Sequence, residues 1–157
     1  NKIPQYWEDI KSGKRVLTSF YNIRKTLLED IAEFEVEEVY AYNMRFDYLS
    51  LNNTERWLTK SQYRYFLTKD LVICDIMKMA RDVIAKMPTY KRFCQEHGYM
   101  TKNNQVQLKA ETVYKFITKD LDFIESHTGL EDVMIEKEIL VYCYRQHKAM
   151  RKKLWEN

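Results

Sequence analysis

Two short apolar runs limit the folds open to this chain more than any other feature. Residues 36–43, VEEVYAYN, and residues 70–75, DLVICD, are rich in β-branched and aromatic side chains and predict buried strands. Each run is followed by a helical pattern, so the pair predicts an α/β fold with parallel strands. Two strands are too few for a stable sheet of this kind. We therefore expect the first strand to have an uncovered edge, which could pair with a second copy of the chain.

The rest of the chain reads as helices. Apolar residues recur at helical spacing from Val16 to Phe34. Pro88 lies near the start of a later helix, and Gly98 follows its end. The remaining helical patterns cover residues 45–67 with a closing turn, 76–86, 88–98 and 108–118, and a last helix runs from Leu130 to about Trp155.

Length and composition favour one helix-rich globular domain over residues 1–157. The chain has three Gly and two Pro, so residues that form loops are scarce. Its three cysteines, Cys74, Cys94 and Cys143, form no CxxC pair and are typical of buried, reduced thiols in a cytosolic protein. No apolar run approaches the roughly 18 residues that span a bilayer, which argues against a membrane protein.

The stretch SHTGLEDVMIEKEIL, residues 126–140, combines a histidine with acids at a helix start. Thr128 and Glu131 have the spacing of a capping box, so Thr128 is the expected N-cap residue. Asp132 then lies in the first turn and His127 just outside the helix. Taken alone, the acids simply complement the helix dipole and His127 is a loop residue.

A second stretch, YAYNMRFD, places Asn43 at the end of the first strand and Asp47 four residues later. The carboxyl ends of strands in α/β sheets are where ligands bind. Carboxylates there and at a helix start elsewhere are the ligands that a two-metal phosphoryl-transfer site requires. The alternative is that Asn43 forms an Asx turn that caps the next helix.

In this order, the two stretches resemble motifs of the DEDD-type 3′–5′ exonucleases, which have a ribonuclease H-like fold. YAYNMRFD is similar to their second motif, Asn-x3-Asp, and HTGLED to the His-x4-Asp motif of their histidine-containing branch. The similarity extends over most of the chain from Val16 and is greatest to phage-encoded members. The resemblance implies a bacterial host cytoplasm.

The resemblance also implies roles for individual residues. Asp47 and Asp132 would bind Mg²⁺ or Mn²⁺ in a two-metal site, and His127 would be the general base that deprotonates water. Asn43 would contact the terminal nucleotide of the substrate or support the site. The implied reaction is hydrolysis of the 3′-terminal phosphodiester bond of a nucleic acid with a free 3′ end, DNA or RNA.

One motif of the family is missing. No Asp-x-Glu sequence, which supplies two of the four carboxylates in the family, occurs in this chain. Together with the absent initiator Met, this predicts the helix-rich C-terminal part of a longer exonuclease, without the first strands of its sheet and with feeble activity or none. The competing hypothesis is a non-catalytic module that binds nucleic acid or protein.

Two other features could contact nucleic acid. Six basic residues, Arg145, His147, Lys148, Arg151, Lys152 and Lys153, lie in the predicted last helix. They could follow a phosphate backbone or simply complement the helix dipole, and we favour the second interpretation. The run YRYF, residues 63–66, could stack bases beside Arg64, although core packing is the simpler expectation.

Overall fold

The chain divides after Glu37 into two units, which are described separately. The computed structural model describes residues 3–124 and 128–156. The units are Asn1–Glu37 and Glu38–Asn157. Helices dominate both, and the second unit also contains a small parallel sheet. The fold is therefore mixed α/β and rich in helices.

The N-terminal unit contains two helices, α1 (Ile3–Lys11) and α2 (Phe20–Glu33). α2 begins four residues after Val16, where we predicted it, because Ser19 is its N-cap residue and accepts a hydrogen bond from the Asn22 N–H at 3.2 Å. No residue of either helix is buried. The apolar periodicity thus predicts the helix, but within this unit that face has no core to enter.

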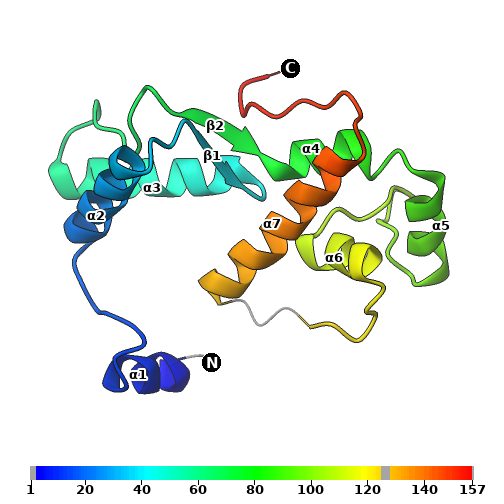
Figure 1. Cartoon of the computed structure of the whole chain (residues 1–157), viewed down its shortest axis with the longest axis horizontal. Coiled ribbons are helices and arrows are strands. Elements are labelled where there is room, and N and C mark those ends of the chain that lie inside the picture. Colours follow the sequence, from blue (N-terminus) through cyan, green and yellow to red (C-terminus); the bar gives the residue numbers. More distant parts are fainter. Residues whose placement is uncertain (1–2, 125–127, 157) are drawn as a thin grey trace. The chain divides into compact units, whose positions relative to one another are not determined.

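The C-terminal unit begins with the two predicted strands. β1 (Glu38–Ala41) and β2 (Val72–Asp75) are parallel, with Tyr40 opposite Cys74. Helix α3 (Met44–Thr59) connects them and packs against both (Figure 1). The predicted parallel pair is confirmed, each strand being shorter than its apolar run. Among the described residues, β1 has no second strand partner, so one edge of β1 is unpaired as expected.

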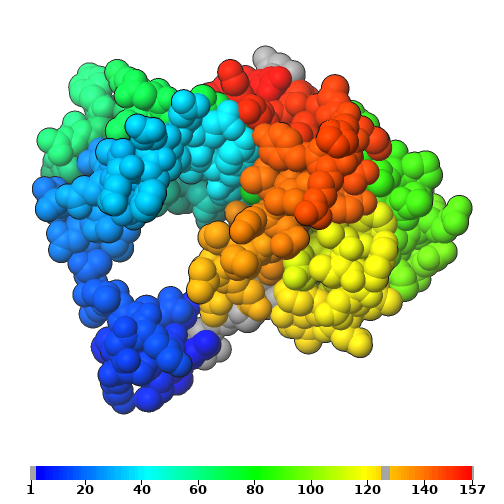
Figure 2. Space-filling view, in the orientation of Figure 1, coloured from blue at the N-terminus to red at the C-terminus, as the bar shows by residue number. Residues whose placement is uncertain are grey.

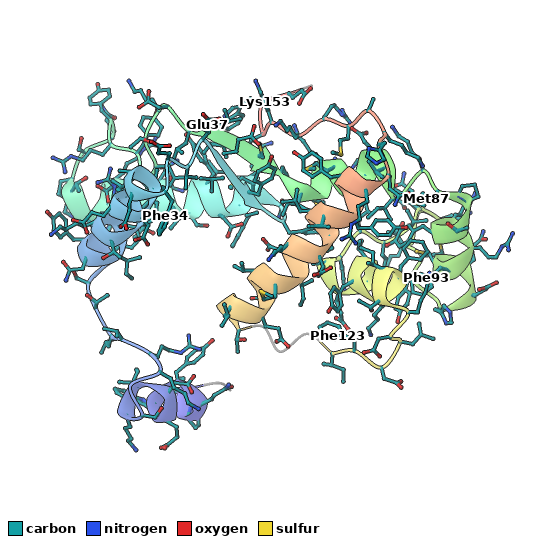
Figure 3. All side chains as sticks on the ribbon, viewed as in Figure 1. Phe34, Glu37, Met87, Phe93, Phe123 and Lys153 are labelled. Atoms are coloured by element: carbon teal, nitrogen blue, oxygen red, sulfur yellow. The ribbon has the colours of Figure 1, made fainter. Side chains whose placement is uncertain are left out.

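The core of this unit lies among its later helices. They are α4 (Ile76–Val83), α5 (Pro88–Glu96), α6 (Ala110–Thr118) and α7 (Gly129–Arg145), and both α4 and α6 pack against α7. Figure 3 shows Phe93 between α5 and α6, and its ring lies 5.5 Å from that of Phe116. All three cysteines are free and buried, as predicted. The most buried side chains include Ile76, Met79, Tyr90, Val113 and Ile139.

The last helix is shorter than predicted. It ends at Arg145 rather than near Trp155, and His147 follows with a left-handed φ of 50°. The segment 146–156, here called the C-terminal strap, is irregular and lies on the surface beside α7 (Figure 2, red). Its backbone bonds to β2 at both sides of Cys74, Asp75 N–H to Lys152 O and Leu154 N–H to Ile73 O, each 2.8 Å. The strap therefore covers the outer edge of β2.

Over residues 3–124 and 128–156, none of the helices has both the length and the apolar character needed to cross a bilayer.

Candidate active site

The carboxyl ends of β1 and β2 are joined through Asp75. The Asn43 N–H donates to Oδ1 of Asp75 at 3.2 Å, and the same oxygen accepts the Met77 N–H at 2.9 Å. Asp75 is therefore the N-cap of α4 as well as the tie between the two strand ends. Its side chain is buried, at 3% exposure. This places a carboxylate at the edge of a parallel sheet where ligands bind.

Asn43 occupies a left-handed conformation at the start of α3. Its φ is 62° and its ψ 44°, a region that Asn adopts more easily than most residues. Its side chain forms no cap hydrogen bond and the residue is exposed. The Asx-turn alternative is therefore wrong. A left-handed Asn turns the chain sharply from β1 into α3 and leaves its amide at the strand end.

Asp47 lies in the first turn of α3, next to this strand end. Partial burial raises the pKa of its carboxyl group, and the negative charge of Asp75 raises the pKa further. Two carboxylates thus repel each other at the carboxyl end of the sheet. A cation bound at Asp47 would offset this penalty, because it favours the ionised form of that carboxyl group.

Tyr42 connects the end of β1 to the segment before α6. It is partly buried, and its hydroxyl donates to the Leu108 carbonyl at 2.6 Å. Burial raises the pKa of Tyr42, with smaller contributions from the negative charges of Asp75 and Glu136. Glu136 therefore lies within electrostatic reach of the strand ends. Because it is one helical turn from Asp132, both acids are on the same side of α7.

Asp132 lies in the first turn of α7, where the sequence predicts it. Thr128 is the N-cap residue as expected, but its side chain makes no cap hydrogen bond. The Asp132 N–H donates to the Thr128 carbonyl at 2.9 Å. Its Oδ1 is buried and has no hydrogen-bond partner among the residues that the structure describes, an unusual condition for a carboxylate oxygen. His127, the predicted general base, lies outside the described residues.

The structure therefore brings only some of the predicted site residues together. Asn43 and Asp47 meet at the end of β1, together with Asp75, while Asp132 begins a separate helix. Asp75, not Asp132, contributes to the raised pKa of Asp47. In the described part of the chain, no three His, Cys, Asp or Glu side chains are grouped to hold a metal ion.

Asp75 is the site residue that sequence reasoning missed. A signal for it exists, because it is the last residue of the second apolar run, as Asn43 is of the first. In a parallel pair, the residues that end both strands lie at the same edge. Its position could therefore have been inferred once the parallel pairing was assumed.

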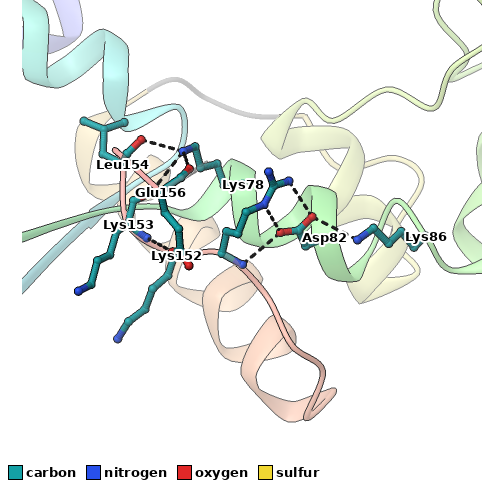
Figure 4. Close-up of polar contacts among 8 residues, drawn as sticks. Lys78, Asp82, Lys86, Lys152, Lys153, Leu154 and Glu156 are labelled. Atoms are coloured by element: carbon teal, nitrogen blue, oxygen red, sulfur yellow. Dashed lines mark hydrogen bonds and ion pairs between the residues drawn. The ribbon is translucent and has the colours of Figure 1, made fainter.

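The basic residues near the C-terminus have mixed environments. Arg145 alone lies in α7, so the expectation of one basic helix end is wrong. Arg151 forms a bidentate pair with Asp82 of α4, at 2.8 and 2.9 Å (Figure 4). Lys152 pairs with Glu38 at 2.6 Å. These two cations hold the strap in place rather than face a ligand.

The aromatic residues of the run YRYF, residues 63–66, differ in burial. Phe66 is buried at 3% exposure, and its N–H donates to Oδ1 of Asn52 at 2.8 Å. Tyr63 and Tyr65 are 81% and 41% exposed. Core packing is therefore correct for Phe66 and wrong for the two tyrosines.

Comparison with family models, curated proteins and solved structures found no protein that matches this chain. The functional argument therefore depends on the residues themselves and their arrangement.

Proposed function

We propose that the chain is part of a metal-dependent 3′–5′ exonuclease of the histidine-containing DEDD type, with a ribonuclease H-like arrangement of its sheet. The observation that carries this proposal is the placement of two carboxylates at the carboxyl ends of the parallel strands, Asp75 at the end of β2 and Asp47 in the first turn of the helix that follows β1. Oδ1 of Asp132 supports it, because a buried carboxylate oxygen normally has a donor or a cation beside it and this one has no hydrogen-bond partner among the described residues.

Asp47 and Asp132 would bind Mg²⁺ or Mn²⁺, whose preferred ligands are carboxylate oxygens. When bound, such ions supply an activated water and stabilise the charge that develops on the phosphate. Asp75 is a positioning residue, since it holds the backbone of Asn43 and caps α4. Asn43 would contact the terminal nucleotide, and His127 would take the proton from the attacking water.

The alternative is a non-catalytic module that binds nucleic acid or protein. It is favoured by the missing Asp-x-Glu motif and by the absence of a three-ligand group among the residues that the structure describes. Both hypotheses include nucleic acid as a partner, so binding by itself does not separate them. Cleavage does.

The test is a nuclease assay on 3′-labelled single strands of DNA and of RNA, with Mn²⁺ or Mg²⁺ and with EDTA. We expect slow, metal-dependent release of mononucleotides, which Asp132→Asn reduces at least a hundredfold while the circular dichroism spectrum stays unchanged. Glu138→Gln, an exposed acid on the same helix, is the matched control and should keep full activity. Cleavage that survives Asp132→Asn would refute the site, and no cleavage by the chain with either metal would favour the non-catalytic alternative.

A further inference from the structure

A hollow of about 1040 Å³ lies beside the amino end of β2, with Val72 and Ile73 in its wall. It is thus at the other end of the strand from Asp75, about 10 Å away at the rise of a β-strand. Its volume is at the upper end of the range typical of ligand sites. Its aromatic wall comes from α3, from the segment after α3 and from the C-terminal strap: Tyr48, Tyr63, Tyr65 and Trp155.

Two of the aromatic rings that line the hollow, those of Trp155 and Tyr65, contact neighbouring side chains although they are exposed. Trp155 is 64% exposed and packs edge-on against Tyr48, with ring centroids 5.7 Å apart. Tyr65 lies under the guanidinium of Arg56, 4.9 Å from its centroid. Rings that are already oriented lose little further conformational freedom when a flat ligand stacks on them.

The C-terminal strap is anchored in a way that fixes Trp155. The ammonium of Lys78, on α4, donates to the carbonyls of Leu154 at 2.7 Å and Glu156 at 2.6 Å, on both sides of Trp155 (Figure 4). The backbone bond from Leu154 to Ile73 holds the same point against β2. Hydrogen bonds to the backbone of the two residues that flank Trp155 thus fix its position, while its ring remains mostly in solvent.

The charges around the hollow favour an anionic ligand. Lys69 and Lys153 line it, with Glu156 as its acidic residue. The Glu156 carboxylate already accepts the N–H groups of Lys152 and Lys153, at 3.0 and 3.2 Å. The ammonium groups also disfavour a cationic ligand, such as a quaternary amine, which aromatic rings could otherwise bind.

A second hollow, of about 490 Å³, adjoins the first through Lys153 and Glu156, which line both. Its other basic residues are His147, Lys148 and Lys152. Lys152 is paired with Glu38, whereas no ion pair of the described residues includes Lys148. An aromatic surface therefore continues directly into a basic one.

We propose that these two hollows form a binding site for single-stranded nucleic acid. Bases stack on Tyr63, Tyr65 and Trp155, and the phosphate backbone continues past Lys153 toward Lys148. Stacking platforms beside a basic groove are the general means of binding unpaired strands, because every base has a flat face. A duplex does not fit this chemistry, since its bases are already stacked on one another. The inference rests on the proposed function, which requires a nucleic-acid substrate, and neither of the proposed metal ligands, Asp47 and Asp132, lines the two hollows.

The test is fluorescence anisotropy of a labelled single-stranded oligonucleotide with the full chain, in EDTA so that no cleavage occurs. We expect Tyr63→Ala and Trp155→Ala each to weaken the Kd about tenfold. The matched controls Tyr21→Ala and Trp57→Ala, exposed aromatics at 72% and 69% outside the hollow, should leave the Kd unchanged. Lys148→Gln should reduce the slope of log K against log salt by about 0.7, the value for one phosphate contact on a single strand.

Each other outcome has a defined meaning. Failure of the wild-type chain to bind the oligonucleotide overturns the proposal, as does equal binding by Tyr63→Ala. If Trp155→Ala unfolds the chain by circular dichroism, Tyr63→Ala decides, because that ring is 81% exposed. If both variants instead change the oligomeric state in size-exclusion chromatography and keep their Kd, the hollow is a protein interface and the proposal is wrong. If the wild-type chain cleaves nothing and Tyr63→Ala weakens binding of the oligonucleotide, the exonuclease proposal is refuted and this binding site is supported.

Discussion

Asp82 and Asp47 lie in two regions of the C-terminal unit and have opposite electrostatic environments. Asp82, on α4, accepts hydrogen bonds from the guanidinium of Arg151 at 2.8 and 2.9 Å and from the Arg151 N–H at 3.1 Å. These bonds hold the pKa of Asp82 well below its usual range. Burial and a second carboxylate do the reverse to Asp47 and raise its pKa.

The difference separates a structural acid from a candidate functional one. Asp82 has a cation supplied by the chain itself, and the pair joins the C-terminal strap to α4. No ion pair among the described residues includes Asp47 or Asp75, and partial burial, together with the negative charge of Asp75, raises the pKa of Asp47. Like charges held close together cost free energy, so their presence indicates a site that is completed by something from outside the chain.

The largest effect is expected when Asp82 loses the guanidinium of Arg151. Arg151→Ala should lower the free energy of unfolding by about 2 kcal/mol at pH 7, because a nearly buried carboxylate loses its charge-assisted hydrogen bonds. Urea denaturation measures this. Since the pKa of Asp82 is lowered in the folded state, its contribution is present above about pH 4 and fades as the pH falls further. The cost of Arg151→Ala should therefore shrink in acid.

Lys86→Ala is the matched control for Arg151→Ala. Lys86 also pairs with Asp82, at 3.3 Å, but its side chain is 67% exposed. Its removal should cost less than about 0.5 kcal/mol. Equal losses in the two variants would mean that the bidentate geometry of Arg151 adds nothing, and the contrast with Asp47 would lose its basis.

An intermediate effect is expected when a cation binds at Asp47. Mg²⁺ or Mn²⁺ should raise the free energy of unfolding by about 1.4 kcal/mol at ten times its Kd, because the ion binds the folded state and offsets the repulsion. Thermal unfolding with and without metal measures the gain. Asp47→Asn should remove it, whereas Asp82→Asn should lower stability but keep the response to metal. A shift of equal size in Asp47→Asn would show that the ion binds elsewhere.

The smallest effect is expected when the repulsion is removed without metal. In EDTA at pH 7, Asp47→Asn should stabilise the chain, by less than about 1 kcal/mol, since a neutral amide costs less to bury than a carboxylate and does not repel Asp75. The pKa of Asp47 is raised in the folded state, so its ionised form is destabilising above that pKa and the penalty disappears as the pH falls. The stability gained by Asp47→Asn should therefore decrease toward pH 4, because the wild-type chain loses the Asp47 penalty there. Asp82 behaves in the opposite way, since its stabilising contribution is what the wild-type chain loses in acid. A loss of stability at pH 7 would contradict the assignment.

Local patterns predicted the parts of the fold that depend on neighbours in sequence. The strands, their parallel pairing and the position of Asp132 in a first helical turn follow from β-branched runs and helical spacing. Ser19, the N-cap residue of α2, is also a local signal, because Ser is a preferred residue at this position. Apolar periodicity alone places the start of the helix at Val16, four residues before its first residue, Phe20.

The C-terminal strap could not be read in the same way. Residues 146–155 have a composition that suits a helix, and nothing local marks Arg145 as its end. The strap instead forms ion pairs with Asp82 and Glu38 and backbone hydrogen bonds with β2. All of these partners are at least 69 residues away in the sequence. Contacts at such separation decide the conformation only after the sheet and α4 have formed, so tertiary structure overrides helix propensity here.

The sequence by itself determined where strands and helices lie, which acids stand at their ends and which residues resemble exonuclease motifs, because side-chain periodicity and capping are local properties of the chain. Tertiary structure alone decided which acids obtain a cation: Arg151 comes to Asp82 from 69 residues away, while Asp47 meets Asp75. It also brought Trp155 against Tyr48 and so built the aromatic hollow. Electrostatic and packing energies depend on distance in space, and a linear pattern does not contain that distance.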